Sequence, residues 1–262
     1  MCIIRKIAKN VLPHFIVKRF ITPPPSTKHI YPVELTEDEK KIIDYIVDNN
    51  LTMASRERLF ATLMSCKYVL ENNLDGDFVE CGVWRGGNSI IAAWMFKLYN
   101  SNNKVYLYDT FQGMTPPTEK DIELNGDKTT NERLVTEELN KSESWSQNIW
   151  CYASLDDVRN NFSKIGLLSA NVEFIQGDVL QTLNQTIPDK ISVLRLDTDW
   201  YESTKKEMDV LYKRIVPKGV FMVDDYGHWG GSKKAVDEYF EKNSNRPFLH
   251  YIDYTGRLGL KI

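Results

Sequence analysis

The stretch of the chain from residue 191 to residue 227 decides the fold. Residues 191–200 read I-S-V-L-R-L-D-T-D-W, and residues 219–227 read G-V-F-M-V-D-D-Y-G. Each segment is a short apolar run followed at once by acids, which is typical of a buried strand of a parallel sheet. Residues 202–216 between them have apolar residues at helical spacing, and Pro217 and Gly219 follow. The stretch therefore predicts strand, helix, strand.

The acids of these two segments fall directly after the predicted strands. They are Asp197, Asp199, Asp224 and Asp225. A right-handed strand-helix-strand unit places its two strands side by side, so these acids meet at the carboxyl edge of the sheet. Converging carboxylates repel one another unless a cation neutralises them, and Mg²⁺ is a natural occupant of oxygen-rich sites. A single Asp at such a position is more often a helix cap or a solvated loop residue, whereas two acid clusters after successive strands favour a functional site.

Two further strands, predicted over residues 78–81 and 105–108, carry a second set of signals. The first contains Glu80 and leads into the turn G-V-W-R-G-G at residues 82–87, whose glycines let the backbone approach a ligand closely. Asp109 follows the second strand, where a carboxylate can accept hydrogen bonds from ribose hydroxyls. The turn lacks the G-K-[ST] ending of a phosphate-binding loop.

The remaining strands complete a doubly wound, mostly parallel seven-stranded α/β sheet. A strand over residues 172–175 is followed by Gly177 and Asp178. Asp178 could bind the amine of a heterocycle or simply cap a helix, and the sequence favours neither. The alternating apolar runs at residues 248–252 and 258–262 flank a turn with a glycine, which predicts a hairpin with an antiparallel last strand.

The predicted organisation has three parts. Residues 1–25 form a basic amphipathic segment that ends in a proline linker and is expected to pack or to make a dimer contact rather than lie on a membrane. Residues 26–75 form a helical cap that opens with a T-x-x-E capping box at Thr36. Residues 76–262 form the main domain, with a polar lid insertion over about 111–148.

Composition narrows the function classes. The chain has 33 Lys and Arg against 36 Asp and Glu, a formal net charge of -3, so no global field points to nucleic acid. Its 4 cysteines are scattered without C-x-x-C spacing, as expected of reduced thiols in a cytoplasmic protein. No apolar run is long enough to span a bilayer, and no cleavage site follows the basic N-terminus.

Taken together, these motifs resemble the class I S-adenosylmethionine-dependent methyltransferases. More closely, the chain resembles the macrocin O-methyltransferase family, which includes the mycinose and noviose sugar methylases of antibiotic pathways. The matching motifs are T-M-A-S-R-E-R-L at residues 52–59, G-D-F-V-E-C-G-V-W-R-G-G at 76–87, Y-D-T-F-Q-G-M at 108–114, L-R-L-D-T-D-W-Y-E-S-T at 194–204 and V-D-D-Y-G at 223–227.

The resemblance implies Mg²⁺-dependent methyl transfer from S-adenosylmethionine to a sugar hydroxyl of a small-molecule or saccharide acceptor. It implies Asp197, Asp224 and Asp225 as metal ligands and Asp199 as the base, while His228 is the rival base or a cap of the last crossover helix. The cofactor residues expected on this basis are Glu80, Gly82, Trp84, Ser89, Asp109, Thr110, Asp178, Val179 and Asp197.

Other functions stay open from sequence. The same metal site could serve a catechol-like or phenolic acceptor, or the chain could be a non-catalytic scaffold of the same fold. A homodimer is possible. Four aromatic residues near the acids could stack on a sugar ring or belong to the core, namely Trp200, Tyr201, Tyr226 and Trp229.

Overall fold

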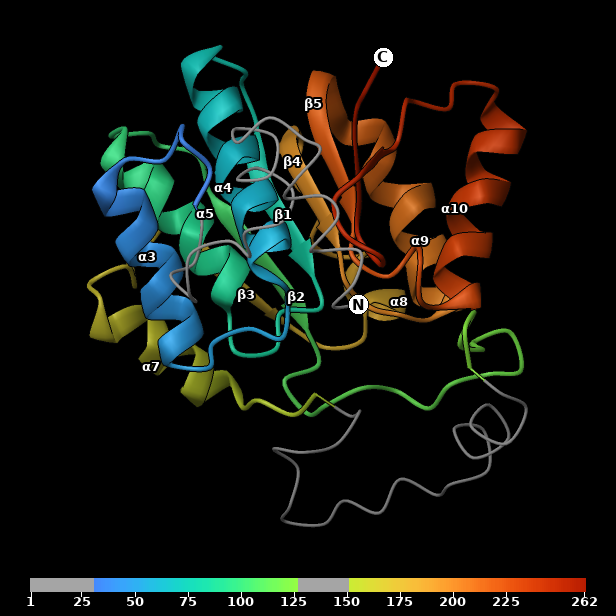
Figure 1. The fold of residues 1–262 in the computed structure, drawn as a ribbon. Helices are drawn as coiled ribbons and strands as arrows, with labels where there is room; N and C mark the ends of the chain where they lie inside the picture. The colour runs from blue at the N-terminus through green and yellow to red at the C-terminus, as the bar shows by residue number, and fades with distance from the viewer. Residues whose placement is uncertain (1–30, 127–150) are drawn as a thin grey trace, which may run out of the picture. The chain divides into compact units, whose positions relative to one another are not determined.

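The computed structural model describes residues 31–126 and 151–262 (Figure 1). The chain divides into two compact units, Met1–Lys40 and Lys41–Ile262. In the first unit the predicted capping box is confirmed at the start of α3 (Glu37–Asp48). The Thr36 N–H donates to Glu39 Oε2 at 2.7 Å, and the Glu39 N–H donates to Thr36 Oγ1 at 3.3 Å. The predicted segment 1–25 lies outside the described residues.

The second unit contains a seven-stranded sheet in the order β3-β2-β1-β4-β5-β7-β6. The first five strands of that order are parallel, β7 is antiparallel to β5, and β6 is antiparallel to β7. The predicted fold class and terminal hairpin are therefore confirmed. The strands are β1 (Asp77–Cys81), β2 (Val105–Asp109), β3 (Val172–Gln176), β4 (Ile191–Leu196), β5 (Ile215–Val223), β6 (His250–Tyr251) and β7 (Arg257–Leu260).

Helices cover both faces of this sheet (Figure 1). On one face α4 (Arg56–Glu71) packs on α5 (Gly87–Leu98), β4 and β5, with α7 (Leu155–Lys164) further out. On the other face α9 (Tyr201–Leu211) packs on β4, α10 (Gly230–Asn243) and the short α8 (Val179–Thr182). No helix among residues 31–126 and 151–262 has the length and apolar character needed to cross a bilayer.

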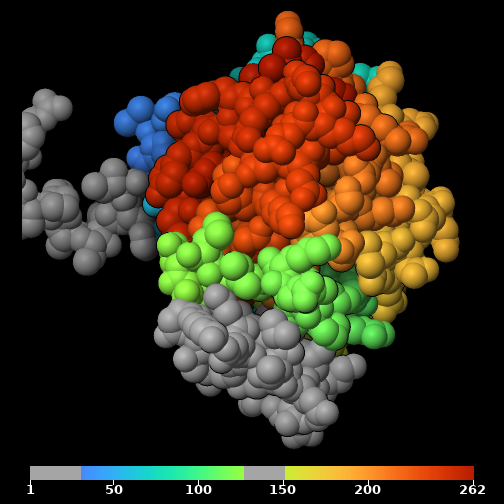
Figure 2. Space-filling view, turned by 90° about the vertical axis from the view of Figure 1, so that its right-hand side faces the viewer, coloured from blue at the N-terminus to red at the C-terminus, as the bar shows by residue number. Residues whose placement is uncertain are grey.

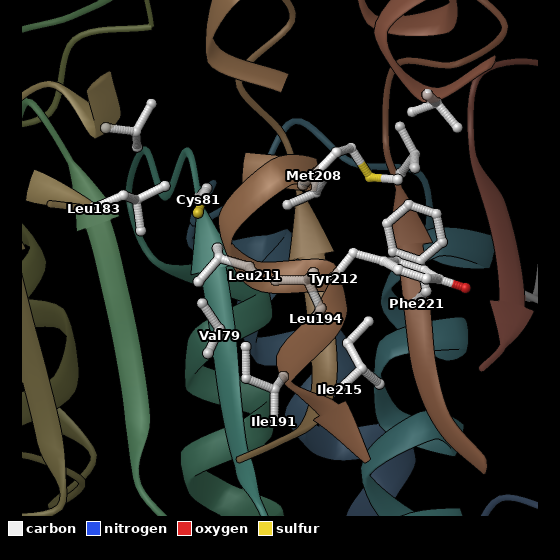
Figure 3. Packing of buried hydrophobic residues seen from close by; sticks show 14 of the residues in the cluster. Val79, Cys81, Leu183, Ile191, Leu194, Met208, Leu211, Tyr212, Ile215 and Phe221 are labelled. Atoms are coloured by element: carbon white, nitrogen blue, oxygen red, sulfur yellow. The ribbon is translucent and has the colours of Figure 1, made fainter. Parts of the chain in front are cut away.

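Side chains alternate along the central strands, so each strand directs one set of residues to each face of the sheet. In β1, Val79 and Cys81 belong to the apolar cluster beneath α9 and α10, together with Leu194 of β4 and Phe221 of β5 (Figure 3). Neighbouring residues of a strand point to opposite faces, so Glu80 faces α4 and α5 instead. The second face of the sheet can thus bring charged groups to its carboxyl edge.

The helix predicted over residues 202–216 is shorter than expected. It ends at Leu211, a 3-10 turn covers Tyr212–Arg214, and β5 begins at Ile215. Ile215 pairs with Ile191 and is buried in the core, so tertiary packing overrides the helical spacing. The register with β4 shifts beyond this pair, and Pro217 lies in that irregular stretch, where a missing N–H is tolerated.

The described part of the predicted lid packs against the amino ends of α9 and α10. Figure 2 shows this green segment beside the orange and red helical layer. The Gly230 N–H donates to the Ile122 carbonyl at 2.8 Å. The buried Asp121 carboxylate accepts the Tyr201 N–H at 2.7 Å and so caps α9 from a distant part of the chain. Residues 127–148 of the predicted lid lie outside the described residues.

This distant cap predicts a stability loss for Asp121→Ala. The Tyr201 N–H would remain buried without its acceptor, so we expect the free energy of unfolding to fall by about 1–3 kcal/mol. Urea denaturation followed by circular dichroism measures it. Asp156→Ala, at an exposed position in the first turn of α7, is the matched control and should stay within about 0.5 kcal/mol of the parent. Equal losses in the two variants would show that Asp121 is not a cap.

Candidate active site

A cavity of about 350 Å³ lies at the carboxyl ends of the parallel strands. The predicted site residues that line it are Glu80, Gly82, Trp84, Asp109, Thr110, Asp178, Val179, Asp197, Asp199, Asp224, Asp225 and His228. Ser89 is the exception, because it is fully buried behind Glu80 and donates its hydroxyl to that carboxylate. The structure therefore brings the acids that follow β4 and β5 into the same cavity as the glycine turn after β1.

The glycine turn after β1 lies directly against the acidic loop after β4. Gly82 has a φ of +80°, and a Cβ there would come within 1.8 Å of the Asp197 carbonyl oxygen. The Asp197 N–H donates to the Cys81 carbonyl at 2.8 Å. Only glycine fits this close approach, and it places the backbone of the turn beside the acids.

Asp109 holds the glycine turn in place. Its Oδ2 accepts the N–H groups of Val83 at 2.7 Å and Trp84 at 3.1 Å, and its Oδ1 accepts that of Phe111 at 2.7 Å. Burial raises the pKa of this carboxyl. The neighbouring Thr110 hydroxyl donates to the Gly113 carbonyl at 2.6 Å. Asp109 thus organises the backbone around the cavity, and its predicted bond to ribose remains a prediction.

Asp178 and Val179 also line the cavity. The Asp178 carboxylate accepts the Leu180 N–H at 2.9 Å and so caps α8, which begins at Val179. This is the capping role that the sequence left open, and the carboxylate lines the cavity as well. Its predicted contact with a heterocycle is neither shown nor opposed by this geometry.

Three carboxylates converge as a possible metal site. Asp197, Asp224 and Asp225 each offer an oxygen, and these atoms lie within 4.8 Å of one another. Asp225 Oδ2 is buried without a hydrogen-bond partner among the described residues. A buried acceptor of this kind needs a donor or a cation, so the donor set fits a divalent ion that prefers oxygen ligands.

Asp199 is held beside this cluster in a strained conformation. Its φ is +63°, in the left-handed region that is uncommon for residues other than glycine. Its carboxyl hydrogen-bonds the Asp225 carboxyl and the Trp229 side chain, and burial together with the Asp197 charge raises the pKa of Asp199 to about 7. Two carboxyls that share a hydrogen bond must share a proton. Backbone strain of this kind is concentrated at functional sites.

Arg195 is the central residue that sequence reasoning missed. Its guanidinium is 2% exposed and pairs with Glu80 at 2.8 Å, with Asp197 at 2.5 Å and with Asp224. Arg58 of α4 makes a second ion pair with Asp224. One signal was visible, because an arginine interrupts the apolar run V-L-R-L, where a buried cation requires buried acids.

The cluster still carries an excess of negative charge. Among the described residues, the cluster comprises six carboxyls and two guanidiniums, namely those of Glu80, Asp197, Asp199, Asp224, Asp225 and Asp253 and those of Arg58 and Arg195. Burial raises the pKa of Glu80 and of Asp224 to about 7, and that of Asp225 well above its usual range. Burial thus disfavours the ionised forms of these carboxyls, and a bound cation would favour them.

Glu207 stands behind the acidic loop. It is fully buried in α9, and its two oxygens lie 2.9 and 3.1 Å from the Thr198 hydroxyl, between Asp197 and Asp199. Burial raises its pKa to about 8. Sequence reasoning missed this residue too, since a glutamate in an amphipathic helix normally faces solvent.

His228 contributes to an aromatic wall of the cavity. Its Nε2 lies 3.5 Å from Glu123 Oε1, and Trp229 rather than His228 is the N-cap residue of α10. The ring of His228 packs edge-on against Trp229 and Tyr254, and Trp229 packs against Trp200. Of the four aromatics noted in the sequence, Trp200 and Trp229 line the cavity.

The other two aromatics are engaged elsewhere. Tyr201 donates its hydroxyl to Glu238 at 2.6 Å, and Tyr226 donates to Asp237 at 2.7 Å. Both acceptors lie on α10, so these tyrosines tie that helix to the carboxyl edge of the sheet. They act as packing residues at this edge.

The sheet order with its reversed β7 and the cavity at the carboxyl edge define the Rossmann-like fold of the class I methyltransferases. The chain belongs to the macrocin O-methyltransferase family: the model described as Macrocin-O-methyltransferase (TylF) matches residues 34–258. The resemblance seen in the sequence is thereby confirmed, and the family is one of enzymes that methylate oxygen.

Individual relatives agree with this assignment. The demethyldecarbamoylnovobiocin O-methyltransferase of Streptomyces niveus is 33% identical over 79% of this chain and 74% of its own length. A Streptomyces olivaceus enzyme, named as a 4'-O-methyltransferase of a rhamnosyl tetracenomycin C, is 32% identical over 78% of this chain and 73% of its own. The solved O-methyltransferase NovP is 31% identical, with a TM-score of 0.68 over 80% of this chain and 81% of its own.

The buried Glu207 predicts a stability effect that depends on pH. Its pKa in the folded protein is raised, so its contribution to stability is fully present below about pH 4.5, the ordinary range of glutamate, and is lost as the pH rises through about 8. Glu207→Gln should therefore gain stability relative to the parent between pH 5 and pH 9, by on the order of a few kcal/mol. Denaturation at both pH values measures it.

The exposed Glu202→Gln, on the first turn of the same helix, provides the control. Its difference from the parent should be nearly the same at both pH values, since an exposed carboxyl titrates alike in the folded and unfolded chain. A difference for Glu207→Gln that does not change with pH would contradict the prediction.

Proposed function

We propose that this O-methyltransferase transfers the methyl group of S-adenosylmethionine to a sugar hydroxyl in a Mg²⁺-dependent reaction. The observation that carries the proposal is the meeting of three aspartates within 4.8 Å of one another in the same cavity as the glycine turn. Transfer of a methyl group from a sulfonium to a weakly acidic hydroxyl needs alignment of the two atoms, stabilisation of the developing charge and a base.

The metal would be held by Asp197, Asp224 and Asp225. When bound, Mg²⁺ would supply a positive charge that lowers the cost of the negative charge developing on the acceptor oxygen. Arg195 fixes two of the three carboxylates, since it pairs with Asp197 and Asp224. The ligand oxygens are therefore positioned before the ion binds, which reduces the reorganisation that binding requires.

Asp199 is the residue that would accept the proton of the hydroxyl. Its turn holds it next to Asp225, and the Trp229 side chain orients its carboxyl. His228 is the rival, and its Nε2 lies 3.5 Å from Glu123 Oε1. We therefore assign proton transfer to Asp199 and place His228 in the wall that contacts the acceptor.

The methyl donor would lie along the glycine turn. Gly82 allows the close approach of a ligand to the backbone, and Asp109 and Asp178 line successive parts of the cavity. The Glu80 carboxylate is bound by Arg195 and by the Ser89 hydroxyl, so its position at the base of the glycine turn is fixed. Trp84, Thr110 and Val179 would complete the contacts to the cofactor.

The aromatic wall favours a sugar as the acceptor. Indole rings pack well against the C–H faces of pyranoses, and Trp200 and Trp229 lie on this wall beside Asp199. The relative from Streptomyces olivaceus is named for a rhamnosyl compound. The alternative of a non-catalytic scaffold is disfavoured, because the chain belongs to an enzyme family.

A panel of acceptors tests the proposed substrate class. Simple rhamnosides and other glycosides are compared with catechols under the same conditions, with transfer of the radiolabelled methyl group as the readout. We expect labelled glycosides. Turnover of catechols alone would support the phenolic acceptor instead.

The role of Asp199 predicts a large kinetic defect for Asp199→Asn. The amide cannot accept the proton, so we expect kcat to fall by about 10²–10⁴-fold. Calorimetric binding of S-adenosylhomocysteine should stay within a fewfold of the parent, because the donor lies along the other wall. His228→Asn is the comparison variant. A larger loss of kcat in that variant would transfer the role of base to His228.

Metal removal tests the role of the three aspartates. Dialysis against EDTA should abolish methyl transfer, and Mg²⁺ should restore it in the parent protein but not in Asp225→Asn. Asp225 is chosen because its Oδ2 has no partner among the described residues, so this change breaks no ion pair of Arg195. Full turnover after EDTA treatment would exclude the metal from the mechanism.

A further inference from the structure

Arg58 joins the acid cluster to the terminal hairpin. Its Nη1 contacts Asp224 Oδ2, and its Nε lies 2.9 Å from Asp253 Oδ2, in the turn between β6 and β7. The side chain is 15% exposed and lines the cavity, in contrast to the fully buried Arg195. Arg58 is therefore the cation of the cluster that has room to change partners.

Asp224 is fully engaged by the two arginines. Its Oδ1 pairs with Arg195 and its Oδ2 with Arg58. A divalent ion held by the same carboxylate would share these oxygens and would repel both guanidiniums. Arg195 also holds Glu80 and Asp197, so its position is fixed. The repulsion consequently falls on Arg58.

Asp253 offers Arg58 an alternative partner that is itself held firmly. Its carboxylate accepts the Ser55 hydroxyl at 2.6 Å and the Gly256 N–H at 2.7 Å. These hydrogen bonds lower the pKa of Asp253, so it stays ionised. A fixed negative charge here draws the Arg58 guanidinium away from Asp224.

We propose that Arg58 is an internal counter-ion that competes with the divalent cation for Asp224, and that Asp253 moderates this competition by binding the same guanidinium. The inference rests on the metal site of the proposed function. It makes Arg58 a positioning residue that sets the affinity of the site. Loss of the Arg58 charge should tighten metal binding, and loss of the Asp253 charge should weaken it.

The experiment is a titration of the full-length protein with Mn²⁺ in the absence of a methyl donor, with free Mn²⁺ measured by electron paramagnetic resonance. Arg58→Gln should bind Mn²⁺ about tenfold more tightly than the parent or better, since a neighbouring positive charge is gone. Arg58→Lys keeps the charge and should stay close to the parent. Asp253→Asn should bind Mn²⁺ severalfold more weakly.

A control on the same helix separates this local effect from a change in net charge. Arg56 Nη1 pairs with Asp44 Oδ1 at 2.8 Å, and Arg56→Gln removes the same charge. Its Mn²⁺ affinity should remain within about twofold of the parent, since screening weakens charges at a distance. Thermal unfolding checks that each variant is folded, and Asp253→Asn carries the test if Arg58→Gln is not.

The possible results separate the two proposals. Tighter binding by Arg58→Gln and weaker binding by Asp253→Asn support the counter-ion. If the parent binds Mn²⁺ and folded Arg58→Gln binds it equally well or more weakly, the counter-ion proposal is wrong and the metal site stands. Absence of Mn²⁺ binding in every variant overturns the metal site and the counter-ion with it.

Discussion

The site depends on one buried guanidinium on a central strand. Arg195 reaches carboxylates from three adjacent strands or the loops that follow them, namely Glu80, Asp197 and Asp224. A buried charge is costly unless its partners are in place, and removing one partner of such a pair is strongly destabilising. The carboxyl edge of the sheet can therefore be formed only with its acids drawn together. The acid cluster is part of the interior of the protein as well as part of its cavity.

The two arginines neutralise only part of the negative charge of this cluster, and burial together with the remaining charge raises the pKa values of its buried carboxyls. Burial alone would drive each carboxyl to bind a proton, as the raised pKa values of Glu80 and Asp224 indicate. Among the described residues, Asp225 Oδ2 has no hydrogen-bond partner, and Asp199 is held in a strained turn. Uncompensated charge and strain are both costly, and both are found where the fold leaves room for a ligand.

Sequence patterns predicted the parts of the structure that depend on periodicity. Short apolar runs located the central strands, and acids after those runs located the cavity, because strand ends share an edge. Such patterns could not predict which arginines pair with which acids inside the cluster. Glu80 and Arg195 are 115 positions apart, and Arg58 and Asp224 are 166 apart. Glu207 was missed for the related reason that a helical pattern shows amphipathicity and does not identify a polar residue that faces inward. Likewise, the end of α9 at Leu211 is set by the pairing of Ile215 with Ile191.

The cavity has two unlike walls, and the acids lie between them. One wall is the backbone of the glycine turn, held by Asp109, where a ligand can approach closely without specific side chains. The other is formed by Trp200 and Trp229 at the start of α9 and α10, which is the wall proposed to contact the acceptor. Because Arg195 fixes Glu80, Asp197 and Asp224 at the central strands, the aromatic wall proposed to contact the acceptor can vary without moving these charged groups.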